Sequence, residues 1–385
     1  MKATGIKSER RMVSTVLKII AVNFLVFLGL VLGLEGTLQL VATIHPSYDV
    51  LFLQPDRGLG WKQVPNLEWT WAGSYWYAAD FSVPVKTNSL GFRDLPRTIR
   101  ALEGVKRVAV LGDSFIEAVQ VPFESTATQQ LERKLNAVTH HDSSPRSHWE
   151  VMNFGISNYG VGQYLLTWQQ YAREYKPDVV AIFVAGLHME RTVQRYEQGA
   201  FSSATKMWIR PTFELRNGEL LFSPARDFDE FVRTQQMLIA KQFDGLNSRP
   251  KRQWITLYFA QQVREELRRW LPRDANDGGA GKPPELDAGV LAVNLSIIKE
   301  LGRSVTSAGA TLIVLDVSQY LGDSPTISNA LRRLCSENEF RYVAAYEDLM
   351  AANGRGTATR WKHDGHLNEA GNEILADSML RAMTQ

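Results

Sequence analysis

Three residues from opposite ends of the chain have the side chains that nucleophilic catalysis requires. Ser114 comes soon after an apolar run, Arg107 to Leu111, and before a predicted helix. A serine hydroxyl becomes a nucleophile when an imidazole takes its proton and a carboxylate fixes the tautomer of that imidazole. His366 and Asp364 supply these two groups close together in the sequence. We therefore predict acyl-transfer chemistry, with Ser114 as the nucleophile, His366 as the base and Asp364 as the residue that orients it.

The same loop allows other interpretations. His363 is a weaker candidate for the base, and His363, Asp364 and His366 together form a conceivable metal site, although no further ligand is evident. A structural role, in which these residues cap the last helix, also fits their position. The sequence contains no G-x-S-x-G, G-x-x-x-x-G-K or H-E-x-x-H motif. Its one cysteine, Cys335, excludes a multi-cysteine metal site within the chain. We predict no metal and no other cofactor.

Apolar strands alternate with amphipathic helices along most of the chain. This alternation predicts an α/β fold in which helices cover both faces of a parallel sheet. Such sheets bind ligands at the carboxyl ends of their strands, so we expect Ser114 and the loop at 363–366 at one edge. The predicted elements, strands and helices in chain order, cover residues 107–111, 122–137, 149–154, 162–174, 178–184, 286–308, 311–317, 326–337, 341–345 and 369–383.

The N-terminal region has the pattern of a membrane segment. Residues 13–34 are almost entirely apolar, and a helix of roughly 20 such residues is long enough to span a bilayer. Four basic residues precede the run: Lys2, Lys7, Arg10 and Arg11. Because positive charges stay on the cytoplasmic side, we predict a cytoplasmic N-terminus and a bilayer anchor within residues 1–45. A cleaved signal peptide and a buried helix of a soluble domain are the competing interpretations.

Two further segments interrupt the alternating pattern. We interpret residues 46–106 as an aromatic-rich connecting segment with a short edge strand at 81–86, whose aromatic side chains pack in a core or form a binding platform. The main domain is predicted at 107–385, with a helical insertion at about 190–285 that contains a basic, amphipathic stretch.

The chain as a whole has 43 Lys and Arg against 41 Asp and Glu, a net charge of +2, so we predict no nucleic-acid partner.

At this point the sequence resembles the SGNH (GDSL-type) hydrolases, specifically their membrane-anchored bacterial members. The matching stretches are Val108–Phe115, Asn153–Gln163, Lys176–Val180, Asp364–Asn368 and, upstream, Thr87–Arg93. The resemblance implies a flavodoxin-like three-layer α/β/α sandwich with a parallel sheet, to which an N-terminal transmembrane helix and the insertion are added. It also implies the roles already given to Ser114, His366 and Asp364.

The sequence departs from the family pattern around the expected oxyanion hole. The glycine that would donate its backbone amide is replaced by Asn158, and the expected asparagine is replaced by Leu187. Asn158 keeps its amide, and its side chain is a possible additional donor. Leu187 has no donor, and His188 is the residue that could replace it. We therefore assign oxyanion or substrate binding to Asn158 and His188. The aspartate also precedes the histidine by two residues, where many members have three.

The resemblance implies a membrane-anchored, extracytoplasmic serine esterase or acyltransferase. The expected substrate is an acyl (acetyl) ester of cell-envelope polysaccharide, and a membrane acyltransferase is a possible partner. The expected location is the bacterial inner membrane, with the main domain periplasmic or extracellular. The alternative, motivated by Leu187 and Asn158, is a catalytically silent binding or scaffold protein with the same fold. A weaker third interpretation is hydrolysis of lipids.

Overall fold

The computed structural model describes residues 2–44, 52–72, 80–139, 148–197, 208–225, 228–229, 233 and 285–384. The chain divides into two compact units. Helix α1 belongs to one unit, and the remaining described residues belong to the other.

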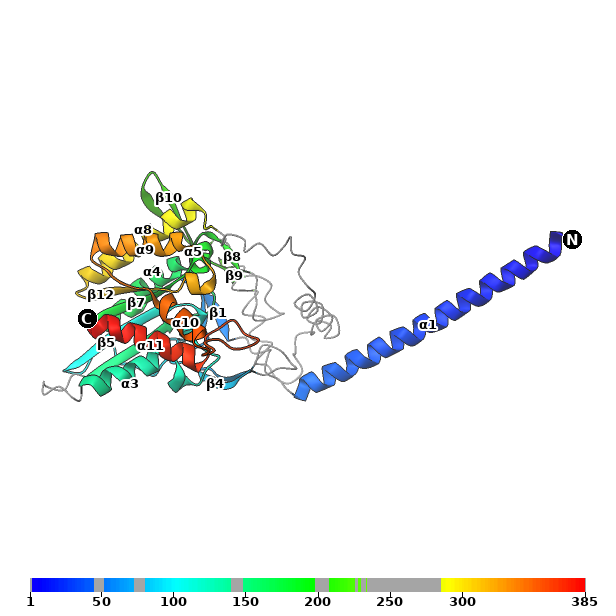
Figure 1. The fold of residues 1–385 in the computed structure, drawn as a ribbon, viewed down its shortest axis with the longest axis horizontal. Helices are drawn as coiled ribbons and strands as arrows, with labels where there is room; N and C mark the ends of the chain where they lie inside the picture. Colours follow the sequence, from blue (N-terminus) through cyan, green and yellow to red (C-terminus); the bar gives the residue numbers. More distant parts are fainter. Residues whose placement is uncertain are drawn as a thin grey trace. The chain divides into compact units, whose positions relative to one another are not determined.

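Helix α1, Lys2–Ile44, contains the apolar run that the sequence places at 13–34 (Figure 1). Its segment from Thr15 to Leu38 is long and apolar enough to cross a membrane. Large apolar side chains of this segment are exposed, among them Phe27 at 64% and Leu30 at 69%. The predicted apolar helix is therefore confirmed, and its features suit a membrane anchor and a signal sequence alike.

The second unit is built on a five-stranded parallel sheet with the strand order β13-β12-β7-β5-β6. Strands β5 and β6 pair from Val105 opposite His148 to Gly112 opposite Gly155, so their carboxyl ends lie side by side. Strand β12 pairs with β7 as far as Asp316 opposite Val184. The strands are β5 Val105–Gly112, β6 His148–Gly155, β7 Val179–Val184, β12 Thr311–Asp316 and β13 Arg341–Val343.

Side chains alternate along β5 between two separate hydrophobic cores. Ala109 and Leu111 belong to one core, and Val108 and Val110 belong to the other. This alternation follows from the twofold repeat of a strand, and it requires apolar cover on both faces of the sheet. The sheet is thus the middle layer of a three-layer α/β/α sandwich, which confirms the predicted fold class.

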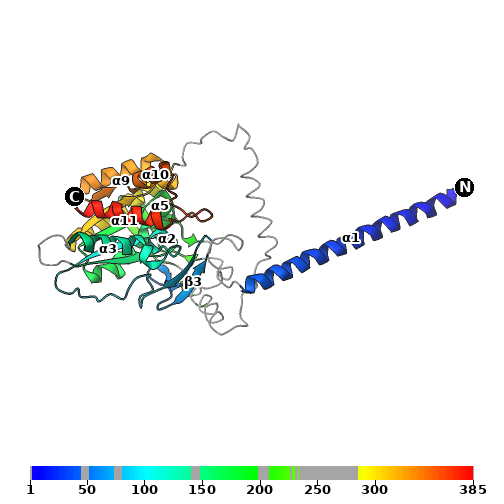
Figure 2. The ribbon, with the colours of Figure 1, turned by 60° about the horizontal axis from the view of Figure 1, so that its bottom comes forward.

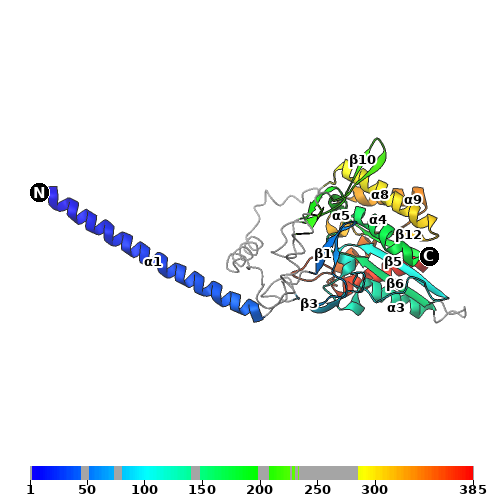
Figure 3. The same cartoon turned by 180° about the vertical axis from the view of Figure 1, so that it is seen from behind.

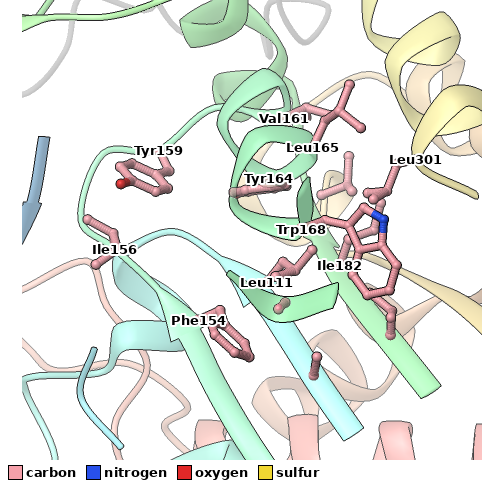
Figure 4. Close-up of a cluster of buried hydrophobic side chains, with 14 of the residues drawn as sticks. Leu111, Phe154, Ile156, Tyr159, Val161, Tyr164, Leu165, Trp168, Ile182 and Leu301 are labelled. Carbon is pink, nitrogen blue, oxygen red and sulfur yellow. The ribbon is translucent and has the colours of Figure 1, made fainter. Parts of the chain in front are cut away.

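Helices of the sequence-predicted pattern supply the two outer layers. On one face α4, Val161–Gln170, and α8, Ala288–Ser307, contribute Trp168 and Leu301, which Figure 4 shows against Leu111 and Ile182 of the sheet. On the other face α3, Ala127–Thr139, and α11, Glu369–Thr384, lie side by side (Figures 1 and 2). Figure 3 shows α4, α8 and α9 on one side of the labelled sheet strands and α3 on the other.

The remaining helical elements are α2 Ser114–Glu117, η1 Phe123–Ser125, η2 Ala172–Tyr175, α5 Gly186–Val193, η3 Gln319–Leu321, α9 Pro325–Asn338 and α10 Ala345–Gly354. The predicted helix ranges overlap η1, η2 and α9, whereas α2, α5, η3 and α10 were not predicted. The alanine, leucine and methionine residues of α10 have high helix propensity.

The aromatic segment upstream of β5 is part of the main domain, so our interpretation of residues 46–106 as a connecting segment is wrong for its described part. Its strands form two antiparallel pairs: β1 Leu53–Asp56 with β2 Gly60–Gln63, and β3 Glu68–Ala72 with β4 Ser82–Lys86. Trp61, Trp69, Phe81 and Phe92 are buried in the same core as the sheet. Burial of each such ring stabilises the fold by about 1.5–3 kcal/mol. These aromatic residues therefore pack in the core.

Besides helical residues at 190–193, 228–229 and 233, the described part of the predicted insertion contains four short strands. They are β8 Tyr196–Glu197, β9 Trp208–Ile209, β10 Thr212–Arg216 and β11 Glu219–Ser223. Phe213 of β10 is buried in the main core. The basic stretch that we expect to be amphipathic, at 249–273, lies outside the described residues.

Candidate active site

Ser114 lies at the turn between β5 and the short helix α2, at the carboxyl edge of the sheet. Asp113 caps this helix, because its Oδ1 accepts a hydrogen bond of 3.0 Å from the Phe115 amide. A Cβ at Gly112 would collide with the Ile116 side chain, so glycine permits the tight turn. The amide of Ser114 belongs to the first turn of α2, where backbone donors have no partner in the helix itself.

The loop that carries His366 lies between α10 and α11 and is closed on itself by backbone contacts. Arg360 and Leu367 form an isolated antiparallel bridge, and the Trp361 amide donates to the His366 carbonyl at 3.2 Å. Asn368 then accepts from the Gly371 amide at 3.0 Å as α11 begins. The loop thus holds the imidazole on a short, tied segment at the edge where Ser114 lies.

The structure brings Ser114, His366 and Asp364 into one chain of hydrogen bonds. Ser114 Oγ lies 2.8 Å from His366 Nε2, although 252 positions separate the two residues. His366 Nδ1 lies 2.5 Å from Asp364 Oδ1, which also accepts from the His366 amide at 2.8 Å. A carboxylate only accepts, so Nδ1 carries the proton and Nε2 is free to take the serine proton. The arrangement has the geometry of an activated nucleophile.

His363, the alternative base, contacts a different carboxylate. Its Nδ1 lies 2.9 Å from Asp80 Oδ1, and its amide donates to Asp80 Oδ2 at 2.7 Å. Asp80 precedes β4, so this contact ties the upstream segment to the loop of His366. Among the described residues, no group of three or more His, Cys, Asp and Glu side chains is arranged to hold a metal ion.

Asn158 lies in the turn after β6, beside the nucleophile turn. The amide of Ile156 in the same turn donates to the Gly112 carbonyl at 3.2 Å, which holds the two turns together. Asn158 has a φ of 64°, in the left-handed region that favours glycine. Its Oδ1 accepts from Arg191 Nη2 at 3.2 Å, and its carbonyl accepts from Arg210 Nη2 at 2.9 Å. The main chain and side chain of Asn158 are therefore both held in place.

His188 does not lie where an oxyanion donor is needed, so the structure contradicts the role that we predicted for it. Its side chain is fully buried, and its Nδ1 accepts from the Ala185 amide at 3.0 Å. Its Nε2 lies 3.0 Å from Asp113 Oδ2, at an angle unsuited to a good hydrogen bond. Because the ring faces Asp113, it has no donor for a substrate. Leu187, the preceding residue, is half-buried.

Asp113 carries a buried negative charge directly before the nucleophile. Its Oδ2 accepts from Arg191 Nη1 at 2.9 Å and faces His188. Burial raises the pKa of the Asp113 carboxyl, but His188 and Arg191 lower it by more, so the pKa lies well below its usual range. Asp113 therefore stays ionised, and its charge requires these two partners.

A second buried carboxyl, Glu117, joins the nucleophile helix to the turn of Asn158. Ser157 donates to it from its hydroxyl and its amide, and Gln63 donates from its side chain. Burial raises the pKa of Glu117 to about 7. Arg191, Glu117 and Asp80 are residues that the sequence analysis missed. Only Arg191 had a detectable signal, because it lies one helical turn after Leu187 on the same face.

Comparisons with known proteins find similarity in structure. No protein-family model matches the chain, and no curated protein matches its sequence. An acetylxylan esterase from Geobacillus stearothermophilus is 12% identical, with a TM-score of 0.39, over 73% of this chain and 94% of the esterase. A lipase/acylhydrolase from Enterococcus faecalis is 12% identical, with a TM-score of 0.37, over 72% of this chain and 95% of the other. A protein described as a GDSL-like lipase, from Parabacteroides merdae, is 14% identical, with a TM-score of 0.36, over 72% and 95%.

One of these structures is described as GDSL-like, and the activities of all three belong to those proteins. Identities of 12–14% describe a distant likeness in fold. The chemistry of this chain rests on the contacts of its own residues.

Proposed function

We propose that the protein is a serine esterase or acyltransferase in which Ser114 is the nucleophile. The observation that carries the proposal is the hydrogen-bonded series from Asp364 through His366 to Ser114, with distances of 2.5 and 2.8 Å. The nucleophile is only 5% exposed, whereas the imidazole is 24% exposed, so the serine is shielded while the base remains partly open to solvent.

Each step of the reaction uses a group with a defined position. His366 Nε2 takes the proton of Ser114 as Oγ attacks the acyl carbonyl, and the carbonyl oxygen becomes an oxyanion. The amides of Ser114 and Asn158 are the donors proposed for that oxyanion. His366 then protonates the departing alcohol, which leaves an acyl group on Ser114. Water or a sugar hydroxyl, deprotonated by His366, attacks the acyl group and restores the serine.

The proposed substrate is an acyl, in particular acetyl, ester of a cell-envelope polysaccharide. The proposed location is the bacterial inner membrane, with α1 as a single-pass anchor, a cytoplasmic N-terminus and a periplasmic or extracellular catalytic unit. The resemblance in sequence and the exposed apolar surface of α1 support this location. A membrane acyltransferase that delivers or receives the acyl group is the proposed partner. Protease accessibility in intact and permeabilised spheroplasts tests the orientation.

The catalytic proposal is tested by labelling the full chain in detergent with a fluorophosphonate, alongside turnover of a chromogenic acetyl ester. We expect wild type to be labelled and active, and Ser114→Ala to be neither. Ser307→Ala changes an exposed serine at the end of α8 and serves as the matched control, which should behave as wild type. Labelling that persists in Ser114→Ala would refute the assignment of the nucleophile.

The second candidate function is a catalytically silent binding or scaffold protein. It is favoured by Leu187, since this side chain has no hydrogen bond to give where the family has an asparagine. It is opposed by the assembled contact between Ser114 and His366, which a binding protein does not require. Absence of both labelling and turnover in wild type would decide for the silent protein.

A further inference from the structure

The side chains in the first turn of α5 offer no donor to an oxyanion in place of the missing asparagine. The Leu187 side chain has none, and the His188 ring faces Asp113. The two amides before Leu187 are already used: Ala185 donates to His188 Nδ1 at 3.0 Å, and Gly186 donates to Asp323 Oδ2 at 2.7 Å. Any additional side-chain donor must therefore come from another part of the site.

Arg191, one turn further along α5, links the two turns that border Ser114. Its Nη1 donates to Asp113 Oδ2 at 2.9 Å and reaches the Tyr159 carbonyl at 3.5 Å. Its Nη2 donates to Asn158 Oδ1 at 3.2 Å. The Arg191 side chain is 20% exposed, and its planar guanidinium fixes the positions of Nη1 and Nη2 relative to each other. Asp113 and Asn158 are thus set relative to each other by one rigid group.

The contact with Arg191 also decides which way the Asn158 carboxamide faces. A guanidinium has only donors, so Asn158 must turn its oxygen toward Arg191 and its NH2 group away. In the part of the chain that the structure describes, Asn158 Nδ2 has no hydrogen-bond partner. The same side chain is therefore left with two hydrogens to donate.

We propose that Arg191 is a positioning residue that orients Asn158, so that the Asn158 NH2 group supplies the oxyanion donor for which Leu187 has no group. This inference rests on the proposed serine chemistry and deepens it. The donor that family members carry on the helix after the third strand is here carried by the turn after β6, and α5 contributes the group that aims it. Because Arg191 acts through Asn158, its effect exists only while Asn158 has a side chain.

Steady-state kinetics of the full chain with a chromogenic acetyl ester test this dependence. Arg191→Lys keeps a cation for the buried Asp113 but has no second nitrogen that could donate to Asn158. Asn158→Gly keeps the backbone amide and suits the positive φ, but removes the side-chain donor. We expect each variant to lower kcat by about 10- to 100-fold with KM within about 3-fold, because the lost interaction forms in the transition state. We expect the double variant to be no slower than the slower single variant.

Controls separate this inference from a loss of folding and from a failure of the proposed function. Arg216→Lys, on the exposed hairpin β10–β11, should leave kcat unchanged, and all variants should keep the thermal midpoint within about 4 °C of wild type. Unchanged kcat in Arg191→Lys, or losses that multiply in the double variant, would overturn the role of Arg191 while Ser114 is still labelled. Wild type without labelling at Ser114 would overturn the proposed function and this inference together.

Discussion

The residues proposed to accept the Ser114 proton and those proposed to bind the oxyanion differ in how closely they match the expected catalytic pattern. On the base side, His366 and Asp364 come from one short loop and lie within hydrogen-bond distance, as a serine hydrolase requires. On the oxyanion side, Leu187 stands where the family has asparagine, and Asn158 stands where it has glycine. Arg191 connects the turns of Asp113 and Asn158 by hydrogen bonds. The base side keeps the residue types of the family pattern, with Asp364 one residue closer to His366 than in many members, whereas the oxyanion side has different residues at both expected positions.

The difference has a chemical reason. Proton transfer at neutral pH needs a group that titrates near neutrality and has one nitrogen free to accept, which restricts the base to very few side chains. Stabilisation of an oxyanion needs only well-placed N–H groups, which any backbone amide and several side chains can supply. A protein can therefore rearrange its oxyanion side while it keeps its base unchanged.

The two sides also differ in burial, and this difference separates their effects on activity and stability. His366 and Asp364 are partly exposed, at 24% and 15%. Asp113 and Glu117 are completely buried and carry or accept several hydrogen bonds. We expect changes to His366 and Asp364 to affect turnover with little effect on folding, and changes to the buried carboxyls Asp113 and Glu117 to affect both.

The largest effect is expected for His366→Ala. Without the imidazole no group can take the proton of Ser114, so kcat should fall by about 10⁵- to 10⁶-fold. Because the ring is partly exposed, the free energy of unfolding should change by less than about 1 kcal/mol. Initial rates with the acetyl ester and denaturant unfolding measure the two quantities. A loss of activity below about 100-fold would show that another group serves as the base.

Asp364→Asn and Asp80→Asn compare the two histidine–carboxylate pairs of the same loop. Asp364→Asn allows the wrong tautomer of His366, and kcat should fall by about 10³- to 10⁴-fold. Asp80→Asn weakens the contact with His363, which holds the loop but takes no proton, so kcat should change by less than about 3-fold at a stability cost of about 1 kcal/mol. Equal losses in the two variants would contradict the distinction between His366 and His363.

The sequence predicted the parts of the molecule that depend on local pattern or on general rules of topology. The apolar run before Ser114 indicated a buried strand, and the meeting of parallel strand ends at one edge placed Ser114 near His366. Glu117 and Gln63, by contrast, meet across 54 positions, and His363 and Asp80 across 283. No local periodicity records such contacts. The orientation of His188 was missed because it depends on the Ala185 amide at the start of α5.

Glu117→Gln tests the buried link between the nucleophile helix and the turn of Asn158. The folded-state pKa of about 7 lies above the ordinary value of 4.5, so the folded protein holds a proton that the unfolded chain releases between these values. The free energy of unfolding should therefore fall as pH rises from about 4.5 to 7, by about 3 kcal/mol at most. The variant has a neutral amide at this position, which does not titrate and so lacks this contribution.

Denaturant unfolding of wild type and Glu117→Gln at several pH values measures this contribution as a difference between the two proteins. Burial also raises the pKa of Asp94 to about 7. Because Asp94 is present in both proteins, its contribution cancels in the difference between them. The exposed Glu337, changed to Gln, is the matched control and should show no such trend. A constant difference across the range would show that Glu117 is ionised in the folded protein throughout.

The smallest effect is expected for Leu187→Asn, which restores the residue that the family carries on the helix after the third strand. If Asn158, held by Arg191, already supplies the oxyanion donor, a second amide adds little, and kcat should rise by less than about 10-fold. If that side of the site lacks a donor, the same change should raise kcat by about 10²- to 10³-fold. Leu187 is half-buried, so the substitution should be tolerated, and a thermal melt checks this. The kcat of this one variant therefore decides whether the oxyanion side is rearranged and complete, or incomplete.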